Sequence, residues 1–280
     1  MVILMFKGRT DMAIEAISID HKLDVERTIS GMKFKKCYVD EKMSKKIHKD
    51  VGMYYTLDLI DYYNKDKEII KVISSVIKDV IKDLGDIKDI LVVGLGNHIV
   101  TPDSLGPLVI NKIEVNRHLE VECSYNVSAI APGVMGQTGM ESSDIIKAIV
   151  DDFKPDLVIV VDALACNSPN RMCHSIQFST AGINPGAGIG NNRKKLAKDT
   201  LGCHVLAVGI PTVCDINVFS DEISNDFFVT PNNIDEAMDI LSLILSKGIN
   251  LAFYNWLKTK RYRFWILIVV IFLKSNIIKV

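Results

Sequence analysis

Two aspartates stand where the carboxyl ends of buried strands are expected. Asp103 follows the apolar run 90–93 and a glycine-rich turn, and Asp162 directly follows the apolar run 157–161. Ligands of an open α/β sheet bind beyond the carboxyl ends of its strands, so we expect both side chains on one rim of the sheet. Two neighbouring carboxylates resist being ionised together, and one can be a base while the other remains an acid. Such a pair can activate a water molecule and protonate a leaving amine.

The elements that must position these acids are strands buried on both faces. The runs 90–93, 157–161 and 205–208 are continuous and apolar, which is typical of strands in a parallel sheet. A further strand is expected over Tyr54–Leu59, where aromatic and aliphatic residues dominate. The acids would then lie on adjacent or nearby strands of one sheet.

Helices are expected between these strands. Apolar residues at helical spacing predict amphipathic helices over 69–81, 142–153 and 234–246, the last closed by Gly248. Alternation of strands and helices predicts an α/β fold with a mostly parallel sheet and helices on both faces, as in phosphorylase- or hydrolase-like folds. Residues 12–89 are expected to form a smaller α+β portion before it.

Glycine-rich stretches lie on both sides of the candidate acids. Gly94 and Gly96 begin like a dinucleotide fingerprint, but the third glycine would fall at Ile99, and no P-loop lysine follows. Nucleotide binding is therefore not indicated. The loop 182–195 admits two interpretations: a tight turn that needs positive φ angles, or a main-chain cradle for a substrate's peptide or carboxylate.

Metal ligation is weakly signalled. The six cysteines include no Cys-x-x-Cys pair, and Cys166, Cys173 and His174 are the nearest approach to a ligand cluster. His98 stands in the loop before Asp103 and has no histidine partner at helical spacing. We predict reduced thiols, no metal and no cofactor.

Composition limits the partners of the chain. Among its 280 residues, 33 are Lys or Arg and 34 are Asp or Glu, giving a net charge of −1 that argues against a mainly nucleic-acid-binding protein. The apolar run 264–273 is shorter than the roughly 20 residues that span a bilayer, and the apolar residues 1–6 are too few for a signal peptide. A cytoplasmic protein without membrane or direct nucleic-acid partners is predicted.

Several long motifs resemble, in order, those of the spore germination protease (GPR endopeptidase) family. The likeness extends from about residue 9 to about residue 253, and the chain after Ala252 departs from the family pattern. The blocks that carry it are Arg9–Asp11 with Ala13–Ala16, Gly94–Asn97 with Val100–Pro107, Ala131–Glu141, Asp156–Ile159 with Asp162–Ala165, the 182–195 loop with Asn191 and Arg193, Val208–Val213, and Phe228–Pro231 with Ile234–Asp235.

This resemblance implies an endopeptidase that initiates degradation of small acid-soluble spore proteins during spore germination. It implies a self-processing zymogen and catalysis of the aspartic type by Asp103 and Asp162, without saying which is the base. A homotetramer in the forespore or spore core is also implied, together with a fold distantly similar to hydrogenase maturation peptidases.

Carried over by position, the resemblance places the processing bond between Asp11 and Met12. Residues 1–11 would form a propeptide, residues 12–258 the peptidase domain with an α/β core from 90, and residues 259–280 an atypical apolar tail. Substrate binding is expected of four loop residues: Asn97, His98, Gly188 and Asn191.

Two alternatives to this interpretation stay open. A metal-dependent peptidase would use the two acids, with His98, as ligands. An inactive relative with a membrane-associated tail would owe its location to the run 264–273.

Overall fold

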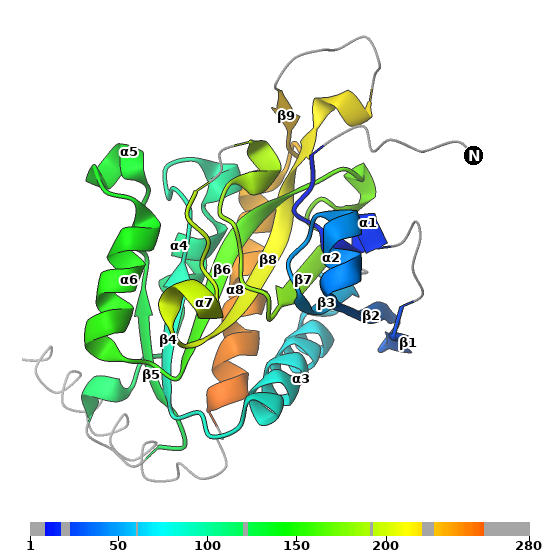
Figure 1. The fold of residues 1–280 in the computed structure, drawn as a ribbon. Helices are drawn as coiled ribbons and strands as arrows, with labels where there is room; N and C mark the ends of the chain where they lie inside the picture. Colours follow the sequence, from blue (N-terminus) through cyan, green and yellow to red (C-terminus); the bar gives the residue numbers. More distant parts are fainter. Residues whose placement is uncertain are drawn as a thin grey trace, which may run out of the picture.

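The computed structural model describes residues 9–17, 23–59, 61–119, 123–190, 193–219 and 227–254. Within these ranges nine strands form one sheet, in the order β1-β2-β3-β7-β8-β6-β4-β5, with β9 beside β8 (Figure 1). The strands are β1 (Val25–Ile29), β2 (Met32–Val39), β3 (Gly52–Asp58), β4 (Asp89–Gly94), β5 (Asn126–Ile130), β6 (Leu157–Cys166), β7 (Ser175–Ser179), β8 (His204–Asp215) and β9 (Phe228–Val229). The helices are α1 (Ala13–Ile17), α2 (Glu41–Ile47), α3 (Asp66–Leu84), α4 (Leu105–Ile110), α5 (Met135–Thr138), α6 (Ser142–Phe153), α7 (Lys198–Leu201) and α8 (Ile234–Phe253).

The sheet is mixed, so the prediction of a mostly parallel sheet is not confirmed. Parallel pairing joins β5, β4, β6 and β8, the strands of the expected α/β core. The pairs from β8 through β7, β3 and β2 to β1 are antiparallel, as is the pair of β8 and β9. One antiparallel pair arises from a short connection between strands that are consecutive in the sequence. Ser30 and Gly31, both with positive φ, form a two-residue turn that folds β1 onto β2.

Alternate residues of the central strands face two separate apolar clusters. Ile90 of β4 and Ile159 of β6 pack with α3, α4 and α8, whereas Leu91 and Val158 pack with α6 and α7 on the other face. This alternation follows from the two-residue period of a strand. Helices therefore cover both faces of the parallel part, as the apolar runs indicated.

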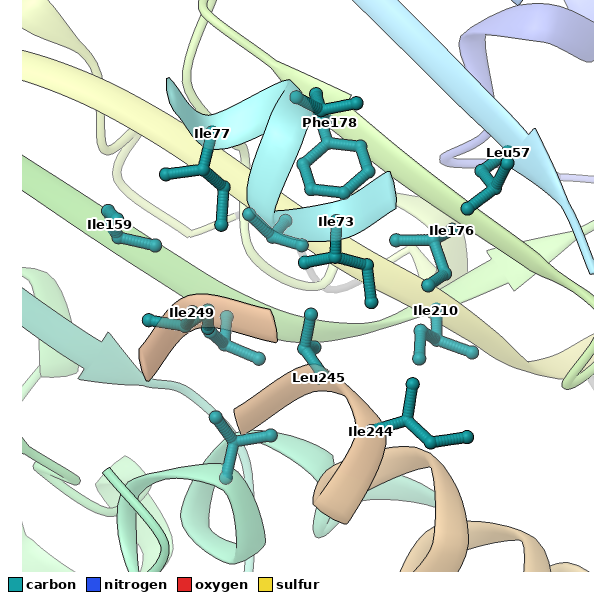
Figure 2. Close-up of a cluster of buried hydrophobic side chains, with 14 of the residues drawn as sticks. Leu57, Ile73, Ile77, Ile159, Ile176, Phe178, Ile210, Ile244, Leu245 and Ile249 are labelled. Atoms are coloured by element: carbon teal, nitrogen blue, oxygen red, sulfur yellow. The ribbon is translucent and has the colours of Figure 1, made fainter. Parts of the chain in front are cut away.

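Helix α3 and helix α8 pack on each other over the larger cluster. Figure 2 shows Ile73 and Ile77 of α3 above Leu245 and Ile249 of α8, with Ile159 of β6 at the left. The expected end of the last helix at Gly248 is wrong, because α8 continues to Phe253. A Cβ atom at position 248 would lie 2.5 Å from Ile73 Cγ2, so this glycine allows the close approach of the two helices.

Two predictions concern membrane spans and the C-terminal part of the chain. No helix among the described residues is long and apolar enough to cross a membrane. The apolar run 264–273 and the tail 259–280 lie outside the described residues.

Candidate active site

A cavity of about 800 Å³ lies at the carboxyl ends of β4, β6 and β8. Four carboxylates line it: Asp103 follows β4, Asp162 belongs to β6, Asp11 precedes α1, and Glu141 precedes α6. The expected meeting of Asp103 and Asp162 on one rim is therefore found, and Asp11 joins them.

Asp162 lies within β6 and does not end it, contrary to expectation. Strand β6 stays paired with β8 as far as Cys166, whereas β4 stops at Gly94, opposite Val161. Asp162 is thus the first residue of β6 beyond the end of β4. Asp162 is only 6% exposed, and its Oδ1 accepts a hydrogen bond from the Ala163 N–H at 3.0 Å.

Asp103 ends a short 3₁₀ turn, η1 (Thr101–Asp103), that the neighbouring elements fix. Its Oδ2 accepts a hydrogen bond from the Asn97 N–H at 2.8 Å, and Thr212 of β8 donates to the Pro102 carbonyl at 2.7 Å. Gly96 has a φ of +112°, and a Cβ atom there would overlap the Asp103 carbonyl oxygen. The glycines of this loop therefore allow close backbone packing.

Burial and like charges perturb the two acids unequally. Burial raises the pKa of Asp162 well above its ordinary value, and the neighbouring Asp103 and Asp11 raise it further. Burial also raises the pKa of Asp103, while the Asn97 N–H and Arg193 act in the opposite direction. Asp162 is more deeply buried and faces two carboxylates, so it is the member of the pair that keeps its proton to higher pH.

The N-terminal segment crosses the cavity beside β6. The Asp11 N–H donates to the Ala165 carbonyl at 2.9 Å, and the Ala165 N–H donates back to Asp11 Oδ2 at 2.9 Å. Arg9 pairs with Asp215 at 3.5 Å, and its guanidinium lies over the Phe228 ring. The segment is therefore anchored on both sides of Thr10.

Residues on both sides of the Asp11–Met12 bond contact buried groups. Met12 is fully buried and packs with Leu164, Cys166 and Cys214. Lys49 donates to the Thr10 carbonyl at 2.9 Å, and burial lowers the pKa of this lysine.

The predicted substrate-binding residues do not all line the cavity. Asn97 lines the cavity, and its Oδ1 accepts from Gln137 at 2.8 Å. His98 is exposed and lies outside the lining, with its Nδ1 3.5 Å from Gln137. Gly188 approaches the Asp11 carboxylate so closely that a Cβ atom would overlap it. Asn191 lies outside the described residues.

Two charged residues of the cavity were not assigned from the sequence. Arg193 lies near the end of the 182–195 loop and Glu141 precedes α6; the Arg193 Nη1 and Glu141 Oε2 atoms are 3.8 Å apart. The sequence signal that could have identified Arg193 as a cavity residue was its position near the end of that glycine-rich loop. Within the described part of the chain, no three His, Cys, Asp or Glu side chains are grouped to hold a metal ion.

Comparisons with known proteins find germination proteases. The germination protease family model matches residues 7–225. A germination protease of Clostridium perfringens (strain SM101 / Type A) is 35% identical over 311 residues, covering 89% of this chain and 95% of the relative. One of Geobacillus sp. (strain WCH70) is 41% identical over 249 residues, covering 78% and 67%. Among solved structures, the [NiFe] hydrogenase maturation protease HycI of Thermococcus kodakarensis KOD1 is 20% identical, with a TM-score of 0.37, and 62% of this chain and 98% of that chain are covered.

Proposed function

Because the chain belongs to the germination protease family and is therefore a peptidase, we propose that it is an endopeptidase that initiates degradation of small acid-soluble spore proteins during spore germination. One observation carries the proposal: Asp103 and Asp162, both with a raised pKa, line one cavity at the rim of the sheet. The enzyme would act in the spore core, where those proteins are found.

The proposed mechanism is aspartic-type hydrolysis with unequal acids. Asp103, which loses its proton first, takes a proton from water as the water oxygen attacks the peptide carbonyl carbon. Asp162, which keeps its proton to higher pH, donates it to the leaving amine as the C–N bond breaks. Proton exchange with solvent restores both groups. The relative burial of the two carboxylates supports this assignment of base and acid.

We also propose that the chain is a zymogen that cleaves itself after Asp11. The reciprocal hydrogen bonds of Asp11 and Ala165 support this, because they hold the chain's own peptide in the cavity that contains both acids. Residues 1–11 would be released, residues 12–258 would form the peptidase domain, and Met12 would become the new N-terminus.

Substrate main chain is proposed to contact Asn97 and the Gly188 loop, with His98 and Asn191 at its margin. Asn97 supports this because it lines the cavity, and Gly188 because it approaches the carboxylate of Asp11. Assembly as a homotetramer is part of the same proposal, and light scattering on a gel-filtered sample measures it.

One experiment tests the activity and the processing together. Purified wild-type, Asp103→Asn and Asp162→Asn proteins are incubated with a recombinant small acid-soluble spore protein, and mass spectrometry follows both chains. We expect the wild type to cut the substrate and to lose residues 1–11, and both variants to do neither. Full activity in either variant would remove that aspartate from the mechanism.

A further inference from the structure

The Arg193 guanidinium lines the same cavity as the two acids and has few partners. Its side chain is 19% exposed and pairs with Glu141 at 3.8 Å, which is beyond hydrogen-bond distance. Among the described residues no side-chain hydrogen bond of Arg193 is formed, although its main-chain N–H donates to the Pro185 carbonyl at 3.3 Å. In the described part of the chain, nothing therefore occupies the guanidinium donors, and a group that enters the cavity can bind them.

Glu141 supplies a counter-charge that leaves these donors open. Its Oε2 atom is buried and accepts no hydrogen bond from the described residues. The bridge between Ile183 and Leu196 joins the two ends of the loop that presents Arg193. The loop and Glu141 thus hold a positive charge at the wall of the cavity.

Arg193 also acts on both aspartates. Its charge favours the ionised form of Asp103 and of Asp162. Arg193, Asp103 and Asp162 line the same cavity, so the guanidinium borders the space that a substrate peptide bond would enter. Charge develops on the carbonyl oxygen of that bond during water attack, and the two carboxyl groups are already engaged with the water and the leaving amine.

We propose that Arg193 is a further catalytic residue, whose N–H groups bind the substrate carbonyl oxygen and stabilise the oxyanion of the tetrahedral intermediate. This inference rests on the proposed two-aspartate function. As the water oxygen bonds to carbon, the π electrons of the C=O bond move onto oxygen, and the guanidinium holds that charge without releasing a proton. When the C–N bond breaks, the electrons return and the carbonyl re-forms.

Steady-state kinetics of Arg193→Met and Arg193→Lys on the spore-protein substrate test the proposal. Loss of one oxyanion donor typically lowers kcat about 10²- to 10³-fold. We therefore expect a loss of that size in kcat for R193M with little change in KM, and a smaller loss for R193K, which keeps the charge. The acidic limb of the pH profile of R193K should stay near that of the wild type, and that of R193M should move to higher pH.

Arg117→Met is the matched control, because Arg117 pairs with Asp89 at the opposite end of β4. Wild-type kcat in folded R193M, or a rise in KM alone, would overturn the oxyanion role. If R193M fails to fold, a wild-type kcat in R193K at every pH would do the same. Activity in Asp103→Asn or Asp162→Asn would instead refute the two-aspartate mechanism, so the two failures are distinguishable.

Discussion

Asp11 and Ala165 are joined by two hydrogen bonds in opposite directions, from each main-chain N–H to an oxygen of the other residue. Ala165 belongs to the same strand as Asp162, so the N-terminal segment is held at a fixed place along β6. A peptide from another protein that bound to the free end of β6 would meet the same main-chain groups. Under the proposed function, the chain's own segment would therefore occupy the place of a substrate.

The first prediction concerns the carboxylate of Asp11. Asp11→Ala removes the acceptor of the Ala165 N–H, and a hydrogen bond to a charged group contributes about 1.5–3 kcal/mol. We expect the release of residues 1–11 to slow about tenfold or more, as followed by mass spectrometry over time. Asp151→Ala, which alters an exposed pair with Lys147 on α6, is the control and should process normally. Normal processing of D11A would show that the pairing with Ala165 does not position the bond.

The second prediction concerns stability and the raised pKa of Asp162. A buried carboxyl with a raised pKa binds more protons in the folded state than in the unfolded state. The folded protein therefore loses stability as pH rises from the unfolded pKa, about 3.9, toward the folded pKa. Asp162→Asn removes this penalty, so its melting temperature should exceed that of the wild type at neutral pH.

The gain in D162N should vanish near pH 4, because the wild-type carboxyl is then protonated as well. Each 1 kcal/mol of added stability corresponds to about 2–4 °C in Tm for a domain of this size class. Thermal unfolding at both pH values measures the difference, with the exposed Asp151→Asn as control. An equal Tm gain at pH 4 and pH 7.5 would contradict the titration argument.

The third prediction separates a steric requirement from backbone strain at Gly96. Gly96→Ala places a Cβ atom on the Asp103 carbonyl oxygen and must displace η1. Gly202→Ala imposes a similar positive φ, +80°, but nothing lies within 4 Å of the added atom. Both variants should lose roughly 1–2 kcal/mol of stability from left-handed backbone. Only G96A should also lose peptidase activity, by at least about tenfold. Equal activities of G96A and G202A, assayed at the same folded fraction, would contradict this prediction.

The fourth prediction concerns the contact of α3 and α8. Gly248→Ala adds an atom 2.5 Å from Ile73 Cγ2 in a packed core, and overpacking of this kind costs about 1–3 kcal/mol. The double variant Gly248→Ala with Ile73→Ala should be less destabilised than the sum of the two single variants, as measured by urea unfolding. Additive losses would show that the helices separate freely and that Gly248 is not needed for their contact.

The meeting of Asp103 and Asp162 was predictable because it depends on one rule of parallel sheets. Each follows a continuous apolar run, and β4 and β6 are neighbours in the sheet. The helices over 69–81 and 142–153 were predictable for a similar reason, since their apolar spacing is local. The structure has them at α3 and α6, the latter with the predicted bounds.

Features that depend on distant partners were not predictable. Nothing local shows that β7 pairs antiparallel with both β3 and β8, and this pairing makes the sheet mixed. Glycine is a common residue at the end of a helix, so the sequence predicts that the helix stops at Gly248. The reason for a glycine inside α8 is the close contact with Ile73 of α3, which the local sequence does not show. The ion pair of Glu141 and Arg193 joins two loops whose approach is set by the folded sheet.

The packing of α8 on α3 has a consequence for biosynthesis. The largest apolar cluster needs Leu245 and Ile249 from residues 234–253 to cover strands and a helix made much earlier. Until that segment has left the ribosome, the α3-bearing face of the sheet exposes a large apolar surface, and contacts of such long sequence separation form slowly. The apolar core beneath strands β4 and β6, which carry the cavity at their carboxyl ends, can therefore be completed only after residues 234–253 have been translated.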